Sequence, residues 1–591
     1  MGELLDALVV GAGPVGLTLA SELRRRGVGC RIIDRLDEPS PACKAVGIQP
    51  RTLEVWEDMS CLREALDAGV WLRGQIVYAN GGEPMQMELD PSGMPYGFFA
   101  LPQYEVERVL TAHLAGLGTR IERGVELQAF ADRGDHVGAT LGTPGGGTEA
   151  LSCRYLAGCD GAHSAVRRGL GLSFDGDRFA EEFMLGDVAV DWSQPRGYAV
   201  RVVRKVEGGP DDILVCIPLP GRNRYRVSML VAPELARPAG APVDPIEHGF
   251  VAGRPMPTLQ HLQTVVDRLA PPGTVLSDLR WSSIFGISHR IVDRYSRGRV
   301  FVCGDAAHIH PPTGAQGANT GMQDAYNLAW KLALVVRGSA GPGLLETYDA
   351  ERRPVGEEVV GRTVRHARTQ FGDVEQDPRN VLLREAQLLV GYPDSPIVGE
   401  VSTADSGGSG DSGDSGGSGG SGDSGGSGDS GGSGGSGDSG GSGDGGRGGP
   451  RPGERAPDAI GLVRERVQHP IRVFDLTRGT DHVLLLSARS GATADDARAL
   501  EAVAEAALAS FPAGLRAYAI LDPDVPDPGY VWLPALEDAE GTFGAAYRAT
   551  GTAAYLIRPD GYVGFRAVPA TRDAVGALGT LLSPGRPTPP S

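Results

Sequence analysis

Three glycines near the start of the chain have the spacing of a dinucleotide-binding turn. The segment VVGAGPVGLTLA places Gly11, Gly13 and Gly16 between a strand-like run and a helix-like run. In such a turn the first glycine makes the bend and the second lets the backbone approach a pyrophosphate. The third lets the helix pack closely, with its N-terminus toward the phosphates. Asp34 ends the next strand-like run, 18 residues after Gly16, where a carboxylate can accept hydrogen bonds from a ribose hydroxyl.

Two later segments also end a strand-like run with an Asp beside a Gly. In YLAGCDGAHSAVRRGLG the pair is Asp160-Gly161, followed by the start of a helix. An ordinary turn is the alternative interpretation, because Asp-Gly is common in turns. In FVCGDAAHIHPPTGAQGANT the pair is Gly304-Asp305. Its carboxylate would lie at a sheet edge, where it can bind a second ribose or, through water, a phosphate.

The same segment delays the helix that follows it. Pro311 and Pro312 fix φ and prevent early helix formation. Gly314 and Gly317 then leave backbone N–H groups bare where the expected helix over 319–337 begins. Bare amides at a helix N-terminus favour a negative charge, so we expect an anionic group to lie against this turn.

His308 and His310 in this segment are candidates for a catalytic base or for a metal pair. Asp305 is the one acidic residue near them at ligand spacing, and the dinucleotide interpretation already uses it. A metal site needs more ligands than this, so we predict none.

The elements that position these residues predict an α/β protein of several units. The first 34 residues read as strand, helix and strand, which implies a parallel sheet. Residues 183–234 contain short alternating runs that predict an antiparallel sheet. Beyond 451, strands and one amphipathic helix predict a small α/β domain. The expected units are a discontinuous dinucleotide domain at 1–182 and 295–400, a substrate domain at 183–294 with a contribution from 75–100, and a C-terminal domain at 451–591.

Residues 405–449 are built from Gly, Ser and Asp alone until Arg447. This composition cannot bury a core, so the segment is expected to be a disordered, passive tether between the large N-terminal part and the C-terminal domain.

Composition excludes several classes of protein. The net charge is -18, which argues against nucleic acid as a partner, because phosphate binding needs a basic surface. The seven Cys are scattered without a CxxC pair, as in a reduced cytoplasmic protein. No signal peptide is read at the N-terminus, and no apolar run has the length of a membrane span. We therefore expect a cytoplasmic protein without a membrane partner.

Taken in order, the three motifs resemble those of the class A flavoprotein aromatic hydroxylases, which have the para-hydroxybenzoate hydroxylase fold. The resemblance covers about 1–400 and extends to KAVGIQPRTLEVW, LPQYEVERVL and YDAERRPVG. The C-terminal part is similar to the thioredoxin-like domain of the larger phenol and polyketide hydroxylases. It contains no Cys, so it cannot perform thiol redox chemistry, and a structural or oligomer-contact role is expected for it.

The resemblance implies a Rossmann-like FAD-binding domain with an inserted antiparallel substrate domain. Pro311 would lie near the reactive edge of the flavin, and the amides around Gly317 would face its N1–C2=O side. The residues then expected to bind the cofactor are Gly11, Gly13, Pro14, Gly16, Asp34, Arg35, Lys44, Arg51, Gln103, Asp160, Gly304, Asp305, Pro311, Gly314, Gly317, Ala318 and Asn319. The alternatives are a surface ion pair for Arg51 and a loop position for Gln103.

The implied reaction consumes NADPH or NADH and O2, and it hydroxylates a phenolic or polycyclic aromatic substrate through a flavin C4a-hydroperoxide. The nicotinamide would have no Rossmann domain of its own, so the choice between NADH and NADPH has no readable residue. The family also raises a homodimer as an expected assembly.

One position departs from the family. Yeast-type phenol hydroxylases carry an Asp five residues before the Arg of the RTLE segment, where this chain has Val46. Either another group activates the phenol or the substrate is already acidic, and we assign no base. Tyr225 is a candidate substrate contact, with a core position as the alternative. Baeyer–Villiger oxygenation or halogenation on the same fold, and non-catalytic sequestration of an aromatic compound, remain alternative functions.

Overall fold

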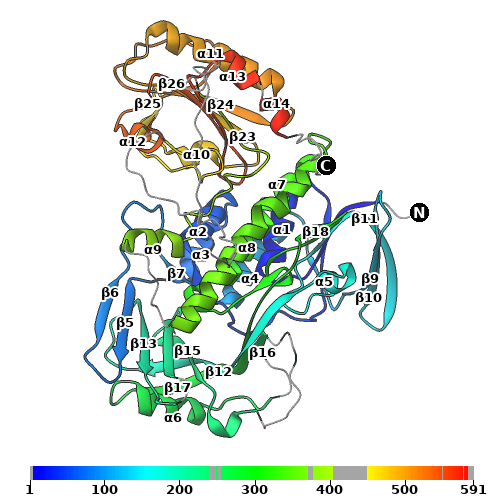
Figure 1. The fold of residues 1–591 in the computed structure, drawn as a ribbon, viewed down its shortest axis with the longest axis vertical. Coiled ribbons are helices and arrows are strands. Elements are labelled where there is room, and N and C mark those ends of the chain that lie inside the picture. Colours follow the sequence, from blue (N-terminus) through cyan, green and yellow to red (C-terminus); the bar gives the residue numbers. More distant parts are fainter. Residues whose placement is uncertain are drawn as a thin grey trace, which may run out of the picture.

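The structure, a computed structural model, describes residues 4–208, 211–237, 244, 246, 248–250, 254–369, 377–402, 449–548, 550–576 and 578–582. Figure 1 shows a central unit beside the N-terminus, a second sheet below it and the C-terminal unit above it. The long helices α7 (Gly317–Val336) and α8 (Gly343–Thr369) belong to the central unit. Among the described residues no helix has the length and apolarity needed to cross a membrane.

The central unit is built on an eight-stranded sheet whose middle strands are parallel. Its main order is β18-β19-β11-β1-β2-β8, and β9 and β10 extend β11 as an antiparallel hairpin. The carboxyl ends of β1, β11 and β19 therefore meet at one edge, and each leads into one of the three motifs. The strands are β1 (Leu5–Val10), β2 (Cys30–Asp34), β8 (Ile121–Arg123), β9 (Glu126–Asp132), β10 (Val137–Thr143), β11 (Gly147–Gly158), β18 (Ser296–Arg297) and β19 (Val300–Val302).

Helices and a small sheet complete this unit. α1 packs against α7 and α4, and its buried face, which includes Leu17, Leu19 and Leu23, joins the core of the sheet. β3, β7 and β4 form a three-stranded sheet in the order β3-β7-β4. The bounds are α1 (Pro14–Arg25), β3 (Gly47–Ile48), α2 (Pro50–Asp58), α3 (Leu62–Ala68), β4 (Val70–Trp71), β7 (Phe99–Ala100), α4 (Gln103–Gly116), α5 (Ala165–Leu170) and α9 (Pro378–Glu385).

The second sheet has nine strands in the order β16-β17-β12-β15-β14-β13-β5-β6, with β20 beside β17. α6 (Leu259–Leu269) covers one face through Leu262, Val265 and Val266. β5 and β6 come from within 74–88, and β12 begins at Asp175, so the sheet starts before residue 183. The strands are β5 (Gly74–Ala79), β6 (Met85–Glu88), β12 (Asp175–Asp191), β13 (Tyr198–Arg204), β14 (Asp212–Pro218), β15 (Arg224–Leu230), β16 (Gly249–Phe250), β17 (Val275–Ile291) and β20 (His308–Ile309).

The C-terminal unit contains a seven-stranded sheet in the order β21-β27-β26-β23-β24-β25-β22, covered on one face by α11, α13 and α14. Trp330 of α7 and Leu344 of α8 belong to that same core. The elements are β21 (Gly399–Ser402), β22 (Leu462–Val463), α10 (Val473–Thr477), β23 (His482–Ala488), α11 (Ala494–Ser510), β24 (Leu515–Leu521), β25 (Ala535–Asp538), α12 (Thr542–Tyr547), β26 (Thr552–Ile557), β27 (Val563–Val568), α13 (Arg572–Gly576) and α14 (Leu578–Leu581).

The expected tether at 405–449 lies outside the described residues except for Gly449. Both of its flanks are described, and both belong to the C-terminal unit. β21 before it pairs with β27, and Gly449 after it packs so closely on the Tyr547 backbone that a Cβ there would be 1.5 Å from the carbonyl oxygen. The repeat therefore departs from and returns to one unit, whereas the sequence predicted a connection between two.

Buried charges join the C-terminal unit to the central unit. Arg558 donates to both oxygens of Glu351 in α8, at 2.7 and 2.8 Å, and to Asp560. Lys331 of α7 donates to the same Glu351 at 2.6 Å. The Asp560 carboxylate also accepts hydrogen bonds from the side chains of Asn327 and Trp330 in α7. The charged side chains of this network are at most 2% exposed, so each charge depends on its partners.

We predict that Arg558→Leu lowers the free energy of unfolding by about 3–5 kcal/mol, because it leaves Glu351 and Asp560 short of a buried counter-charge. Urea denaturation followed by circular dichroism measures this loss. Arg498→Leu is the matched control, since the Arg498 side chain is 63% exposed beside Asp495 and its loss should cost about 0–1 kcal/mol. Equal effects of the two variants would contradict the prediction.

Candidate functional site

The three glycines after β1 have different steric surroundings. Gly11 has φ +100°, and a Cβ there would be 2.4 Å from the carbonyl oxygen of Cys159. A Cβ at Gly16 would be 1.9 Å from the carbonyl oxygen of Gly11, so α1 and the turn pack without room for a side chain. A Cβ at Gly13 would meet nothing within 4 Å. The first and third glycines are required by packing, and the second leaves open space in front of the α1 N-terminus.

Asp34 holds this turn from the end of β2. Its Oδ2 accepts from the amide of Ala12 at 2.8 Å, and its Oδ1 accepts from the amide of Leu36 at 2.9 Å. Oδ1 also lies 3.8 Å from the Arg123 guanidinium, whereas Oδ2 keeps a lone pair that can accept a ribose hydroxyl. Pro14 begins α1, and Arg35 is exposed beside Asp34.

Glu107 is a candidate site residue that the sequence analysis missed. Gln103, Lys44 and Asp34 all lie close enough to influence the charge of its carboxyl group. Gln103 accepts from the amide of Ala45 at 3.3 Å and donates to Glu107 at 2.8 Å. Burial raises the pKa of Glu107, and the Gln103 hydrogen bond only partly opposes it. Glu107 follows Gln103 by four residues, and residues at this spacing on a helix are neighbours, so the sequence could have indicated the contact.

Asp160, at the end of β11, caps α5 and keeps one oxygen unsatisfied. Its Oδ2 accepts from the amides of Ala165 and Val166, at 2.7 and 3.2 Å. Its Oδ1 is buried and has no partner among the described residues. Burial raises the pKa of this carboxyl. A buried carboxylate oxygen without a donor is a place for a ligand hydroxyl or a water.

The Gly304-Asp305 turn lies directly against the glycine turn. Gly304 has φ +60°, and a Cβ there would be 2.8 Å from Cγ2 of Val15 and 3.4 Å from Cα of Gly321. Asp305 is half-buried, and its carboxylate makes no hydrogen bond or ion pair with a described residue. It is therefore a free acceptor at the edge where the strand ends meet.

The N-terminus of α7 presents unused donors. No side chain caps the helix, and the amides of residues 317–319 bond no described residue. The side chain of Asn319 instead binds the loop before α2, donating to the Gly47 carbonyl at 2.9 Å and accepting from the Gln49 amide at 3.0 Å. Gly314 has φ +68° in the turn before the helix, and Pro311 is buried. This is the bare helix start that the sequence predicted.

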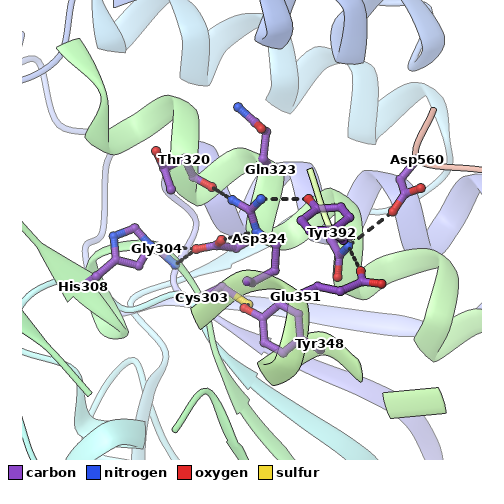
Figure 2. Close-up of polar contacts among 12 residues, drawn as sticks. Cys303, Gly304, His308, Thr320, Gln323, Asp324, Tyr348, Glu351, Tyr392 and Asp560 are labelled. Atoms are coloured by element: carbon purple, nitrogen blue, oxygen red, sulfur yellow. Dashed lines mark hydrogen bonds and ion pairs between the residues drawn. The ribbon is translucent and has the colours of Figure 1, made fainter. Parts of the chain in front are cut away.

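One buried carboxylate joins these parts, and the sequence analysis did not single it out. Asp324 of α7 accepts from the Gly304 amide at 3.1 Å, lies 2.8 Å from Nε2 of His308, and accepts from Nε of Arg352 in α8 at 2.7 Å (Figure 2). Burial opposes its charge, but Arg352 and His308 outweigh burial and lower the pKa of Asp324. Asp324 thus ties the Asp305 turn, the segment before Pro311 and α7 together.

The two histidines of this segment have structural surroundings. Burial lowers the pKa of His310 to about 3, so this ring is neutral, and its Nδ1 lies 3.0 Å from the carbonyl oxygen of Pro311. Among the described residues no three His, Cys, Asp or Glu side chains are grouped to hold a metal ion.

Arg51 does not lie where the sequence analysis expected it. Its guanidinium donates to Glu54 at 2.7 Å and to the Asp560 carbonyl of the C-terminal unit at 2.6 Å, and it lies over the Tyr562 ring. The guanidinium is thus committed to the interface between the two units, so we remove Arg51 from the cofactor set. The surface ion pair that was the alternative is wrong, because this ion pair is buried.

Tyr225 is a core residue. It packs edge-on against Trp192 and joins the cluster that includes Val227, Met229 and Leu262 on the α6 side of the second sheet. Side chains alternate along β15, so the opposite face belongs to Arg226, Ser228 and Leu230. Arg226 donates to the carbonyl of Lys44 at 2.9 Å, which shows that this opposite face is turned toward the central unit. Tyr225 thus occupies the core position that was its alternative, and we no longer propose it as a substrate contact.

Two family models together match most of the chain. Residues 5–363 match the FAD binding domain, and residues 449–584 match the C-terminal part of aromatic-ring hydroxylases. The chain belongs to the FAD-dependent aromatic-ring hydroxylases. It is 36% identical to a flavin-dependent monooxygenase of Mycobacteroides abscessus, over 60% of this chain and 73% of that protein. It is also 36% identical to the rifampicin monooxygenase of Streptomyces venezuelae, over 65% of this chain and 75% of that one.

Among solved structures, a ternary complex of aklavinone-11 hydroxylase with FAD and aklavinone has a TM-score of 0.72 to this hydroxylase. The two chains are 26% identical, and the similarity covers 98% of this chain and 99% of the other. The similarity therefore includes the C-terminal unit as well as the FAD-binding domain.

We predict that Gly13→Ala weakens FAD binding in this hydroxylase without affecting stability, whereas Gly16→Ala lowers the stability itself. A methyl at Gly13 enters the open space before α1, so the apoprotein should keep its melting temperature while the Kd for FAD rises about tenfold or more, about 1.4 kcal/mol. A methyl at Gly16 overlaps the Gly11 carbonyl and should lower the melting temperature itself. Thermal unfolding and FAD titration of the apoprotein measure both effects. Unchanged FAD affinity in Gly13→Ala would contradict the cofactor assignment.

Proposed function

We propose that this protein is an FAD-dependent, NAD(P)H-consuming monooxygenase that hydroxylates a phenolic or polycyclic aromatic substrate. The observation that carries the proposal is the meeting of three strand ends, each with its Gly or Asp, in front of the bare α7 N-terminus. The names of the relatives support the substrate class, since rifampicin and aklavinone are both polycyclic aromatic compounds.

The residues present fit FAD. The open space at Gly13 accommodates a pyrophosphate at the α1 N-terminus. Asp34 and Asp305 each retain acceptor capacity for hydroxyl groups. The free amides of Gly317, Ala318 and Asn319 suit the N1–C2=O side of the ring, where a reduced flavin carries its negative charge. When bound, FAD supplies hydride acceptance from the nicotinamide and the activation of O2.

The chain's own contribution is positioning, charge and the exclusion of water. Asp324 sets the Asp305 turn relative to α7, because this α7 carboxylate accepts from the Gly304 amide and lies beside His308. Pro311 and Gly314 keep side-chain bulk and early helix formation away from the ring edge. The low pKa of His310 keeps its ring neutral beside Pro311, so this ring does not compete with the α7 amides for the anionic flavin.

The substrate side is the face of the second sheet that α6 does not cover. Along β13, β14 and β15 the residues on the α6 face are buried, whereas those on the other face, such as Val215, Ile217 and Ser228, are only half-buried. A sheet face that carries Val215 and Ile217 and that protein side chains leave partly open suits an aromatic ring system.

Arg226 is the charged group that we assign to substrate recognition on this face. It forms no ion pair with a described carboxylate, and its Nε is buried without a partner. Burial lowers its pKa, but an arginine remains cationic. Asp187, its cross-strand neighbour, is bound to Arg224 instead. Arg226 can therefore hold a phenolate and stabilise the charged form of the substrate. This would favour ionisation of the phenol in a chain that has Val46 in place of the family's Asp.

Oxidation of NADPH and NADH in air by FAD-loaded protein tests the function. We expect one class among simple phenols, biphenols and anthracycline-like polyketides to stimulate the oxidation, with 18O from 18O2 recovered in the product and little peroxide. Stimulation with all electrons recovered as hydrogen peroxide supports the flavin chemistry and rejects the substrate tested. FAD-loaded protein that no aromatic compound stimulates would contradict the proposal and favour sequestration.

Arg226→Met tests the substrate contact. A hydrogen bond to a charged partner is worth about 1.5–3 kcal/mol, so we expect the KM for an acidic phenol to rise about ten- to a hundredfold while the Kd for FAD stays unchanged. Tyr225→Phe is the matched control from the opposite face of the same strand and should leave KM as it is. A larger effect from Tyr225→Phe than from Arg226→Met would reverse the assignment of the two faces.

A further inference from the structure

A small cavity lies between the C-terminal unit and the central unit. Its lining includes Arg51 of α2, Gln323, Tyr326 and Asn327 of α7, Tyr392, and Asp560 and Tyr562 of the C-terminal unit. Gln323 and Asp560 can be followed in Figure 2. The cavity offers about 10 Å³ to the centre of a water molecule, which is about the space that one water needs.

Four of the lining residues keep a buried polar atom that has no partner in the part of the chain that the structure describes. These atoms are Nε of Arg51, Oε1 of Gln323, Oδ1 of Asn327 and the hydroxyl of Tyr562. Buried polar atoms in proteins are nearly always hydrogen-bonded to protein or to ordered water. Unpaired groups of this kind are scattered through the chain, but here four of them belong to residues that line one cavity.

The orientation of the Asn327 amide is fixed by its neighbours. Its Nδ2 donates to Glu351 at 2.7 Å and to Asp560 at 3.2 Å. Two carboxylates accept only from the nitrogen side, so Oδ1 is the atom left unpaired.

The orientation of the Gln323 amide follows from a chain of three glutamines. Gln316 donates to Glu385 at 3.0 Å, Gln387 donates to Gln316 at 2.7 Å, and Gln323 donates to Gln387 at 2.5 Å. Each amide accepts on one side and donates on the other, so the series runs in one direction from the Glu385 carboxylate. It ends at Oε1 of Gln323, which needs a donor.

The set of unpaired atoms identifies the occupant. Arg51 offers a donor and the Tyr562 hydroxyl can donate, while Gln323 and Asn327 offer acceptors only. A chloride would face two acceptors, and a sodium or ammonium ion would face the arginine cation. A water molecule accepts two hydrogen bonds and donates two. We propose that this cavity binds one ordered water, which completes the glutamine series and joins Tyr562 of the C-terminal unit to α7.

The water would connect the C-terminal unit to the cofactor end of α7. Gln316 is the residue before α7, and it also donates to the Gly314 carbonyl at 3.0 Å in the turn that precedes the free amides. The glutamine series therefore runs from that turn to the interface between the units. The proposal does not rest on the substrate or on the hydroxylation reaction.

A crystal structure of the FAD-loaded full chain tests the assignment directly. We expect one spherical density peak in the cavity, within about 2.6–3.2 Å of at least three of the four atoms. A bromide soak should give no anomalous peak there. An empty cavity, direct bonds among the four groups, or a bromide peak would each overturn the water assignment.

Two variants test the link to the cofactor. Gln323→Leu removes the end of the glutamine series and fills the cavity, so we expect the water to be displaced and the Kd for FAD to rise about threefold or more. Tyr562→Phe removes one partner and leaves the series intact, so the water should remain and the Kd should change less than twofold. The crystal structure of each variant shows whether the fold is kept. An unchanged Kd in a folded Gln323→Leu variant would overturn the link.

Discussion

The position of helix α7 is the constraint on which the candidate site depends, and one carboxylate sets it. Asp324 is buried in the first half of α7 and binds the Gly304 amide, His308 and Arg352 with its two oxygens. The residues that would face the flavin come from loops that are distant in sequence. Because Asp324 contacts the loop of Gly304 and His308 from α7, it fixes the position of the Asp305 side chain relative to the amides at the start of α7.

The second half of α7 has a comparable role toward the C-terminal unit. Lys331 and Asn327 bind Glu351, and Glu351 is held by Arg558 from the other unit. A buried network of this kind contributes little net stability, because the desolvation of the charges offsets their attraction. What it provides is geometry, since a misplaced unit would leave several charges unpaired. The C-terminal unit therefore fixes the position of α7 through these buried ion pairs.

The sequence predicted those parts of the site that depend on local chain geometry. The turns at Gly11 and Gly304, the carboxylate of Asp34 and the bare start of α7 follow from the steric needs of a strand that ends before a helix. Arg51 and Tyr225 were misplaced for nonlocal reasons. Besides Glu54, the guanidinium of Arg51 contacts the Asp560 carbonyl, 509 positions away, and the face that Tyr225 occupies depends on where α6 packs. Asp324 was missed because a carboxylate within an apolar helix has no distinctive spacing.

The return of the chain to the C-terminal unit on both sides of residues 403–448 has an evolutionary consequence. Ser402 ends an edge strand of that unit's sheet, and Gly449 packs against Tyr547 of the same unit. Repeats of Gly, Ser and Asp codons are prone to gain and lose copies during replication. Here the two described flanks of the repeat lie in the same unit, so we expect such changes to leave the contacts between the two units in place. The candidate site therefore does not depend on the length of the repeat. We expect closely related chains to differ in that length more than in any other segment.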